Sequence, residues 1–269
     1  MKRAVLFDLD GVLVDSRHAQ LATLAGFATS ALGRRVTITD LPAEAATTPR
    51  EHVLAELGYA GAINEDGWDA ATATATLTAQ VFPFVADTLA ALRAADVATG
   101  IVTLRNRQRV NWLLPPGILD LIDVVICYAD AAPKPAPDGL LLALDKLGVS
   151  PGDAVFVGDM ESDMHAAQAA GVTPIGSGWG FSDPSTLTRA GAAVVLPHAD
   201  DLAGTLLSLT GTGLRSAQIQ AILTPNPLRW VAQSQRTVAS DVGCATSSDG
   251  SGVMVYTVGA RAICVELEN

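Results

Sequence analysis

The sequence predicts an α/β fold, with a doubly wound, mostly parallel sheet, an inserted α-helical cap and a small C-terminal β-rich extension. Strand-length apolar runs recur along the first 200 residues, at 4–8, 98–103, 122–127, 154–158 and 192–196. Helix-like stretches lie between them, at 85–95, 136–147 and 161–170, and another follows at 199–209. Strands that are apolar throughout and alternate with helices indicate a parallel sheet that is covered on both faces.

One long segment interrupts this alternation between the first two strands. Residues 16–81 contain no clear strand, and we expect helices there at 17–32, 50–58 and 66–80. The pair Thr48-Pro49 separates the first two of them, since the residue before a proline disfavours helix. We therefore expect a core of residues 1–15 and 82–209, and a helical cap of residues 16–81.

The last sixty residues differ from the rest in pattern. "TGTG" at 210–213 is typical of a linker, and a helix is expected at 214–223. Strand-prone segments follow at 228–233, 252–258 and 261–267, with "SSDGSG" at 247–252 as a turn. This extension, residues 210–269, has no catalytic spacing, and three roles stay open for it: a homodimer interface, an extra wall of the substrate pocket or a partner-binding module.

Composition and charge restrict the function. The 269 residues carry a net charge of −11, which argues against a nucleic-acid-binding surface. An anionic substrate would then need a local positive site. No apolar run approaches the length of about eighteen residues that spans a membrane. The three cysteines, Cys127, Cys244 and Cys264, are not in a metal-binding spacing, so we expect a reduced, cytoplasmic protein with no membrane association.

The first apolar run ends in a pair of carboxylates. In "AVLFDLDGVLVDS", residues 4–16, Asp8 and Asp10 close a strand that reads as buried, and Gly11 follows them. Because burying an unpaired carboxylate is costly, such a pair is not there for stability. One carboxylate could act as a nucleophile and the other as an acid or base. The alternative is a turn in which both aspartates bind nearby backbone N–H groups.

A second strand end and a proline-flanked loop add candidate groups for binding an anion. Thr103, in "GIVTLRN", follows the second strand and offers a hydroxyl, although a threonine there is usually just a strand residue. Lys134, in "APKPAPD", has proline on both sides, which suits a positive charge held in a fixed place near a phosphate. The alternative is an ordinary surface lysine.

A third strand end carries an acidic cluster. In "VFVGDMESD", residues 155–163, Asp159 ends the strand, and Glu161 and Asp163 follow at the start of a helix. Clustered carboxylates repel one another unless a cation is present, and oxygen ligands without His or Cys favour Mg²⁺. Helix capping would explain Glu161 or Asp163, but it does not explain Asp159 in its buried run.

Taken in this order, the four pieces resemble the motifs of the haloacid dehalogenase-like (HAD) superfamily, in its phosphatase branch. The resemblance covers about residues 4–205 and rests on "DLDGVLVDS", Thr103, Lys134 and "GDMESD". The stretches "KPAPD" and "AAQAAGV" are also similar to those of phosphoglycolate phosphatases and β-phosphoglucomutases. The resemblance to this superfamily implies a Rossmann-like core and a Mg²⁺-dependent enzyme whose partner is a small phosphorylated metabolite.

The resemblance also implies a role for each residue. Asp8 would attack phosphorus and form an aspartyl-phosphate, while Asp10 would protonate the leaving alcohol and then deprotonate the attacking water. The metal ligands would be the carboxylates of Asp8 and Asp159 and the main-chain carbonyl of Asp10, with Asp163 holding the metal or its water from nearby. Phosphoryl oxygens would be bound by two residues, Thr103 and Lys134.

The branches of the superfamily differ at named positions. Dehalogenases use a single aspartate, and the phosphonate-cleaving relatives need a cap lysine, whereas residues 16–81 contain none. Mutase relatives use a cap histidine where this chain has Gln20. The expectation is therefore a phosphatase of a sugar phosphate or a phosphoglycolate-like phosphomonoester. The alternatives are a β-phosphoglucomutase-like phosphosugar mutase and a non-catalytic binding or regulatory protein with the same fold.

Substrate choice is expected to depend on the cap. In the relatives a cap loop faces the active site, and "TTPREH" at 47–52 is similar to that loop. Arg50 in this loop and Arg105, just past Thr103, are the candidates for contacting the substrate. The alternative for Arg50 is a solvated arginine at the start of a helix.

Overall fold

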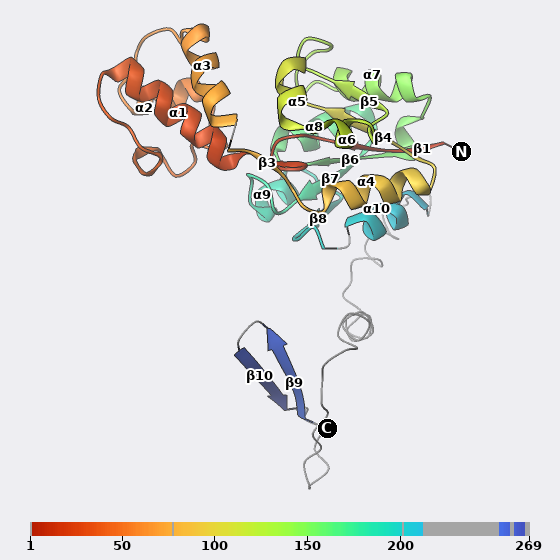
Figure 1. Ribbon diagram of the computed structural model, residues 1–269. Helices are drawn as coiled ribbons and strands as arrows, with labels where there is room; N and C mark the ends of the chain where they lie inside the picture. Colours follow the sequence, from red (N-terminus) through yellow and green to blue (C-terminus); the bar gives the residue numbers. More distant parts are fainter. Residues whose placement is uncertain (1, 77, 201, 212–252, 259–260, 267–269) are drawn as a thin grey trace. The chain divides into compact units, whose positions relative to one another are not determined.

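The computed structural model describes residues 2–76, 78–200, 202–211, 253–258 and 261–266 (Figure 1). The chain forms two compact units, residues 1–221 and 222–269. The first unit contains every segment of the predicted core and cap. The predicted domain boundaries themselves stay a prediction.

The first unit is built on a parallel sheet. In the described part of this unit the strands lie in the order β5-β4-β1-β6-β7-β8, and all neighbours in the sheet are parallel. Their bounds are β1 Arg3–Phe7, β4 Val97–Val102, β5 Val124–Ile126, β6 Ala154–Gly158, β7 Thr173–Ser177 and β8 Val194–Leu196. The predicted α/β fold class is confirmed. Strand order reverses between β1 and β6, and such a switch point forms a crevice at the carboxyl ends of the strands.

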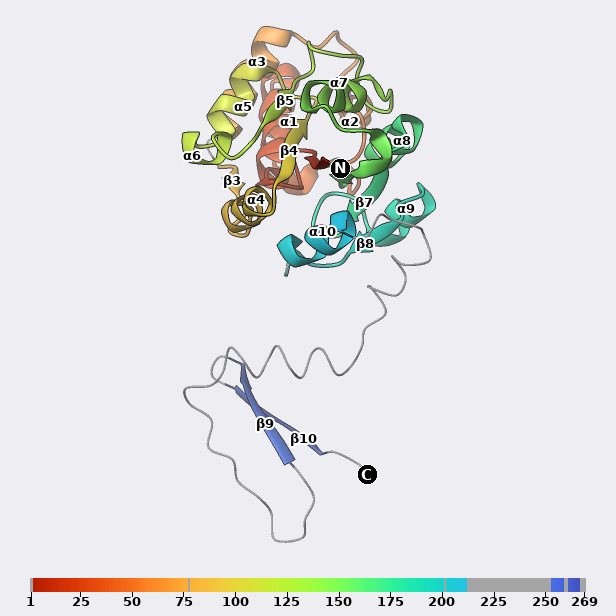
Figure 2. The same ribbon diagram turned by 90° about the vertical axis from the view of Figure 1, so that its right-hand side faces the viewer.

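Helices cover both faces of this sheet (Figures 1 and 2). On one face α4 (Val85–Ala94) and α10 (Leu202–Gly211) pack on the cluster that contains Val5 and Phe7. On the other face α7 (Asp138–Leu147) and α8 (Glu161–Ala170) pack on the cluster with Leu6. The shorter helices are α5 (Arg107–Leu113), α6 (Pro116–Leu119) and α9 (Pro184–Arg189), with a 3-10 turn at Pro151–Asp153. Within the described residues, no helix has the length and hydropathy to cross a membrane.

The central strand β1 is fixed by this double packing. Its side chains from Ala4 to Phe7 are fully buried, and they alternate between the two clusters. Burial of a side chain such as Leu6 or Phe7 contributes about 1.5–3 kcal/mol. Asp8, the next residue, is therefore attached to one of the most firmly held strands in the fold.

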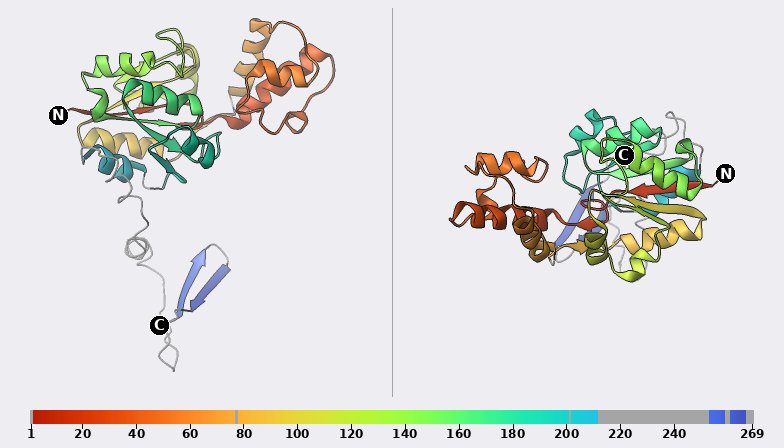
Figure 3. Two further views of the ribbon diagram at one scale, coloured as in Figure 1. Left: turned by 180° about the vertical axis from the view of Figure 1, so that it is seen from behind. Right: turned by 90° about the horizontal axis from the view of Figure 1, so that it is seen from above.

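The segment between β1 and β4 is helical, as expected. We call residues 16–81 the cap segment; a short antiparallel pair of β2 (Val14–Asp15) and β3 (Gln80–Val81) forms its base. Its elements are α1 (Arg17–Leu32), a 3-10 turn (Ile38–Asp40), α2 (Arg50–Glu56) and α3 (Glu65–Thr76). Figure 3 shows them beyond the carboxyl ends of the core strands. They have hydrophobic clusters of their own, one around Phe27 and Leu54 and one around Leu24 and Val53.

Several predicted bounds need correction. Helix α2 ends at Glu56 instead of residue 58, because Gly58 takes a positive φ of 93° that stops a helix. Helix α3 ends at Thr76 instead of residue 80, because residues 80–81 pair as β3. The expected linker at 210–213 begins as the last turn of α10, where buried Thr210 donates its hydroxyl to the Leu206 carbonyl at 2.9 Å.

The second unit contains an antiparallel pair of strands, β9 (Val253–Val258) and β10 (Arg261–Glu266). The strands expected at 252–258 and 261–267 are confirmed by this pair. The expected helix at 214–223, the strand at 228–233 and the turn at 247–252 lie outside the described residues.

Candidate active site

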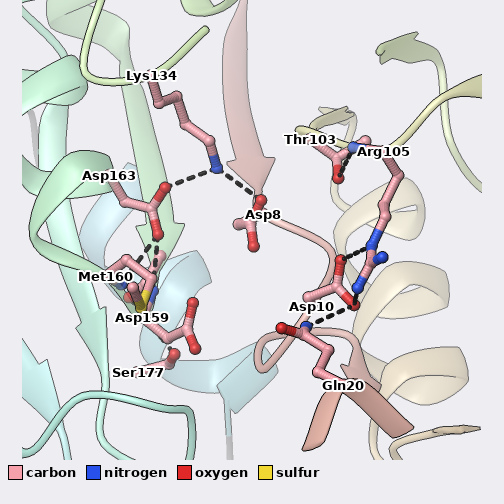
Figure 4. A network of polar contacts seen from close by, with 11 residues as sticks. Asp8, Asp10, Gln20, Thr103, Arg105, Lys134, Asp159, Met160, Asp163 and Ser177 are labelled. Atoms are coloured by element: carbon pink, nitrogen blue, oxygen red, sulfur yellow. Dashed lines mark hydrogen bonds and ion pairs between the residues drawn. The ribbon is translucent and has the colours of Figure 1, made fainter. Parts of the chain in front are cut away.

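The carboxyl ends of three neighbouring strands meet at one cavity. Asp8 follows β1, Thr103 follows β4 and Asp159 follows β6, as the order β4-β1-β6 requires. A cavity of about 280 Å³ opens there. All but one of the predicted site residues line it: Asp8, Asp10, Thr103, Arg105, Lys134, Asp159 and Asp163. Figure 4 shows seven of these side chains converging from separate elements.

Lys134 joins two of the carboxylates. Its Nζ lies 2.6 Å from Asp8 Oδ1 and 2.6 Å from Asp163 Oδ1, and its side chain is only 5% exposed. The same ammonium lies 5.4 Å from the centre of the Phe156 ring. Lys134 is therefore a buried, doubly paired cation at the carboxyl ends of the strands, and the alternative of an ordinary surface lysine is wrong.

Burial and repulsion raise the carboxyl pKa values of Asp8 and Asp159. Burial raises the pKa of Asp8 to about 7, with Asp163 and Asp10 adding repulsion and Lys134 opposing them. Burial and the nearby charges of Asp163 and Asp8 raise the pKa of Asp159 well above its ordinary value. Burial alone would lower the pKa of Lys134, but its two carboxylate partners raise it instead.

The two carboxylates after β6 have different partners. Asp163 Oδ2 accepts the backbone N–H groups of Asp159 and Met160, both at 3.0 Å, so it caps the start of α8 as the capping alternative anticipates. Asp159 Oδ2 accepts the N–H of Phe181 at 2.8 Å, from the loop after β7. Asp159 Oδ1 is buried and has no hydrogen-bond partner. Capping therefore explains one oxygen of Asp163 and leaves Asp159 unexplained.

This arrangement fits a divalent cation. Asp8, Asp159 and Asp163 each offer a carboxylate oxygen, and these oxygens all lie within 4.8 Å of one another. The unpartnered Asp159 Oδ1 is an oxygen that a cation would satisfy. Because the donors are all carboxylate oxygens, the set suits Mg²⁺ better than a metal that prefers nitrogen or sulfur.

Asp10 lines the same cavity but has polar partners of its own. Its carboxylate accepts two bonds from Arg105, at 2.7 Å from Nε and 2.9 Å from Nη2. Ser16 and Gln20 also donate to Asp10 Oδ1, at 2.5 and 3.3 Å. Burial by itself would raise the pKa of Asp10. The charge of Arg105 and the hydrogen bonds from Arg105, Ser16 and Gln20 outweigh burial, so the pKa of Asp10 is lowered overall. The two aspartates of the first motif therefore have opposite pKa shifts.

The remaining predicted site residues differ in their positions and partners. Thr103 lines the cavity, and its Oγ1 accepts the N–H of Arg105 at 3.1 Å. Arg105 lies in the cavity but is paired with Asp10. Arg50 does not line the cavity: it pairs with Glu51 and Glu65 and lies over the Trp68 ring within the cap segment. Arg50 thus stands at the start of α2, as the alternative has it, but these contacts hold it against the cap segment instead of leaving it solvated.

The cap loop approaches the site with other residues. Ala46 lines the catalytic cavity, and Thr47 lines an adjoining cavity of about 890 Å³ between the cap segment and α8. Both cavities share Met160, Ser162 and Phe181 as walls. The residue that reaches the site is thus Ala46, just before the predicted loop 47–52, and within that loop Thr47 lines only the adjoining cavity.

Sequence reasoning missed several residues of the site. Ser16 and Gln20 contact Asp10 from the start of the cap segment, and Arg109 lines the cavity from α5. One signal was available, because Gln20 lies one helical turn after Ser16 at the start of α1. Phe181 contributes only its backbone N–H, which has no sequence signature.

Comparison with known proteins agrees with this geometry. The family model of haloacid dehalogenase-like hydrolases matches residues 2–171. Phosphoglycolate phosphatase from Escherichia coli K12 is 36% identical over 124 residues, which are 45% of this chain and 49% of that protein. The chain thus spans about half the length of the first curated relatives it matches. Phosphoglycolate phosphatase from Yersinia pseudotuberculosis is 33% identical over 235 residues, 82% of this chain and 97% of that one.

Solved structures show the same fold. A HAD family hydrolase from Deinococcus radiodurans, with bound phosphate and sodium, has a TM-score of 0.63 and 28% identity, covering 77% of this chain and 96% of its own. A HAD-superfamily hydrolase from Geobacter sulfurreducens has a TM-score of 0.58 and 26% identity, covering 78% and 97%.

Fold and site together define an α/β protein with a carboxylate and lysine centre at the carboxyl ends of its strands. The chain belongs to the haloacid dehalogenase-like hydrolases. The resemblance drawn from the four sequence motifs is confirmed.

Proposed function

We propose that this chain is a Mg²⁺-dependent phosphatase that hydrolyses a small phosphorylated metabolite through an aspartyl-phosphate on Asp8. One observation carries the proposal. The Asp8 carboxylate lies at the end of a buried strand, bonded to Lys134 through one oxygen, while Asp10 in the same cavity is paired with Arg105. This arrangement separates a nucleophile from a proton carrier, which a two-step phosphoryl transfer needs.

In the first step, Asp8 attacks the phosphorus atom of the ester. Lys134 holds Oδ1 of the carboxylate, so the other oxygen makes the new O–P bond. The bond from phosphorus to the leaving oxygen breaks, and Asp10 gives a proton to that oxygen. Because the pairing with Arg105 lowers the pKa of Asp10, Asp10 carries this proton only when that pairing is released. The products are the free alcohol and the phosphorylated side chain of Asp8. Thr103 and Lys134 bind the phosphoryl oxygens as they carry negative charge.

In the second step, water attacks the phosphorus atom of the aspartyl-phosphate. Asp10, now a carboxylate, takes a proton from this water. The O–P bond to Asp8 breaks, which releases inorganic phosphate and restores the nucleophile. One water molecule is consumed for each ester that is cleaved.

The metal would be held by Asp8 and Asp159 through their carboxylates and by Asp10 through its main-chain carbonyl, with Asp163 supporting it from nearby. When bound, Mg²⁺ neutralises the repelling carboxylates and stabilises negative charge on the phosphoryl group. The buried and unpartnered Asp159 Oδ1 supports this assignment.

The size of the cavity and the relatives favour a small substrate. About 280 Å³ is just below the range of about 300–1,000 Å³ for sites that hold drug-sized ligands. The curated relatives are phosphoglycolate phosphatases. We therefore propose a phosphoglycolate-like ester or a small sugar phosphate as the substrate class.

The contact of Gln20 favours hydrolysis over a mutase reaction. Gln20 Nε2 donates to Asp10 at 3.3 Å, where mutase relatives have a histidine. An amide is not an acid or a base near neutral pH, so it cannot exchange a proton with Asp10 as an imidazole does. A non-catalytic role would not explain why the carboxylates of Asp8, Asp159 and Asp163 are buried close together.

The test is phosphate release from a panel of phosphorylated sugars, phosphoglycolate and nucleotides, with and without Mg²⁺. We expect release from at least one small ester, dependent on Mg²⁺ and abolished by Asp8→Asn. Absence of release from every substrate, or release that Asp8→Asn does not change, would overturn the proposal.

A further inference from the structure

Arg109 is a cation of the catalytic cavity to which the proposed reaction gives no task. It lies on α5 in the core and lines the cavity, with a side chain only 15% exposed. Its Nη2 forms an ion pair with Oδ1 of Asp69, which belongs to α3 in the cap segment. This pair therefore connects the core to the cap at the edge of the active site.

The position of Arg109 is on the leaving-group side of the site. Arg105 lies in the loop before α5 and Arg109 lies in the first turn of that helix, and with Asp10 and Gln20 they line a recess next to the main cavity. Lys134 serves the opposite side, where it binds Asp8 and Asp163. Because Asp10 protonates the departing oxygen in the proposed mechanism, groups beside Asp10 face the part of the substrate that leaves.

The two arginines differ in how firmly their carboxylates hold them. Arg105 makes two hydrogen bonds to Asp10, and both side chains are largely buried. Asp69 is 64% exposed, and ion pairs with such exposed partners contribute little to stability. Water can solvate the Asp69 carboxylate once it is released. Arg109 is therefore the arginine that can exchange its partner for a substrate group at little cost.

We propose that Arg109 is a specificity-determining residue that binds an anionic group on the leaving half of the substrate, a carboxylate or a second phosphate, in exchange for Asp69. The inference rests on the proposed phosphatase activity. It narrows the substrate class to phosphomonoesters whose alcohol carries a negative charge. In a chain with a net charge of −11, such a substrate needs a second local cation besides Lys134.

The same helix offers a matched control. Arg107 lies two residues before Arg109 and pairs with Asp130 and with the carbonyl of Val125, both in the core. Its side chain is 52% exposed, and it is not among the residues that line the cavity. Arg107→Gln removes one positive charge from α5 without touching the recess.

The experiment compares KM and kcat for 2-phosphoglycolate and for phenyl phosphate, whose leaving group is uncharged. Arg109→Gln should raise KM for 2-phosphoglycolate by about tenfold or more, the loss expected for one charge-assisted hydrogen bond. KM for phenyl phosphate should change by less than about twofold, because the exposed pair itself contributes little. Arg107→Gln should leave both values unchanged.

Asp69→Asn separates substrate binding from simple attachment of the cap. If Arg109 exchanges partners, removing its competitor should lower KM for 2-phosphoglycolate by about two- to fivefold. If the ion pair only holds the cap in place, Asp69→Asn and Arg109→Gln will shift both substrates in the same direction, which would overturn the inference. Equal losses on both substrates in Arg109→Gln alone, or a wild-type enzyme without preference for 2-phosphoglycolate, would also overturn it.

The two proposals fail separately. If wild-type protein hydrolyses neither ester with Mg²⁺, or if Asp8→Asn hydrolyses them equally well, the phosphatase proposal fails. If Mg²⁺-dependent hydrolysis is present but Arg109→Gln does not distinguish the two esters, only the inference about Arg109 fails. Thermal unfolding of each variant shows whether it is folded before its kinetics are compared.

Discussion

At the end of β6, Asp159 carries a buried carboxylate with one oxygen bonded to the Phe181 N–H and the other without a partner. Burial and the charges of Asp163 and Asp8 raise the pKa of this carboxyl well above its ordinary value. A buried group in this condition lowers the stability of the metal-free fold. Its presence is explained by ligand binding, since a cation would satisfy the free oxygen and offset the repulsion.

This predicts opposite effects of Asp159→Asn on stability and on metal binding. Asparagine keeps an oxygen that can accept the Phe181 N–H, but it removes one of the repelling charges. We expect the free energy of unfolding without metal to rise by about 1 kcal/mol or more. The increase in melting temperature that Mg²⁺ causes should be lost, together with phosphate release.

Urea unfolding with and without Mg²⁺ measures both effects. Asp145→Asn on the exposed face of α7 is the control for loss of one negative charge, and it should change neither quantity. A metal-free Asp159→Asn protein that is markedly less stable than wild type would show that the carboxylate has a structural role.

The motif residues of the site could be predicted because each one ends an apolar run. Asp8, Thr103 and Asp159 stand after β1, β4 and β6, and the sheet order then brings them together. The partners of Asp10 could not be found in this way. Gln20 and Arg105 are distant from each other in sequence, and only the packing of the cap segment beside the core makes them share one carboxylate.

At the scale of elements, the turn after β1 passes so close to the Asp159 side chain that only a glycine fits at position 11. Gly11 has a φ of +74°, and a Cβ placed on it would lie 2.1 Å from Asp159 Oδ2. Gly180, in the loop after β7, approaches the same side chain, with a Cβ position 2.2 Å from Asp159 Cβ. The Asp159 side chain is thus enclosed by two glycine turns that follow separate strands.

Gly11→Ala should therefore affect the site as well as the backbone. Alanine in the left-handed region costs about 1–2 kcal/mol, and here it would also displace the Asp159 carboxylate. We expect reduced stability, a weaker stabilisation by Mg²⁺ and a large loss of activity. Melting temperatures with and without Mg²⁺, together with phosphate release, measure these effects.

Gly33→Ala is the matched control for this change. Gly33 ends α1 with a φ of +61°, and a Cβ there would have no atom within 4 Å. The Gly33→Ala variant should lose a similar amount of stability, but Mg²⁺ should still raise its melting temperature as much as in the wild type. If Mg²⁺ raises the melting temperature of both variants equally, the close approach of Gly11 to Asp159 is not needed for metal binding.

Most of the elements could be predicted from apolar periodicity, and β7 shows where that signal fails. Residues Thr173–Ser177 form a strand between β6 and β8, yet Pro174 and Gly176 break the apolar run that marks the other strands. Pairing with neighbours on both sides overrides these weak local preferences. The helix ends were also misplaced, because capping and strand pairing set them rather than hydrophobic pattern.

At the scale of the whole molecule, the site links stability to pH. The folded-state pKa of Asp8 is about 7, above its ordinary value of 3.8, and that of Asp159 is shifted in the same direction. At a pH between about 3.8 and about 7, the Asp8 carboxyl keeps its proton in the folded protein and has lost it in the unfolded chain. Stability without metal should therefore fall as the pH rises through this window. Groups with a lowered pKa, such as Asp10 and Asp183, titrate below it.

Magnesium should reverse this trend, because it binds the ionised carboxylates and releases their protons. We expect the rise in melting temperature caused by Mg²⁺ to be larger at about pH 7.5 than at about pH 5.5. Differential scanning fluorimetry at constant ionic strength measures both trends. A metal-free melting temperature that increases across this range, or a larger Mg²⁺ effect at the lower pH, would contradict the assignment of these pKa shifts.

The catalytic unit should not need the last sixty residues. The predicted site residues that line the cavity fall between Asp8 and Asp163, and the first unit ends its described part with α10 at Gly211. A chain that ends at Gly211 should keep kcat/KM within about twofold of the full chain, as expected for independent regions. Light scattering of both chains tests whether residues 210–269 form a homodimer interface, which stays a prediction. A loss of activity without a change in assembly would place part of the second unit in the catalytic function.

The central claim is that Asp8 becomes phosphorylated during the reaction, and Asp10→Asn is the variant that tests it. An amide cannot take a proton from the attacking water, so the aspartyl-phosphate should break down about 10²–10⁴ times more slowly and accumulate. With Mg²⁺ and p-nitrophenyl phosphate, whose leaving group needs little protonation, mass spectrometry of the peptides should find one phosphoryl group on Asp8. The double variant Asp8→Asn with Asp10→Asn should show none. Phosphate release without a phosphorylated peptide at any time, or a phosphoryl group on another residue, would contradict the account.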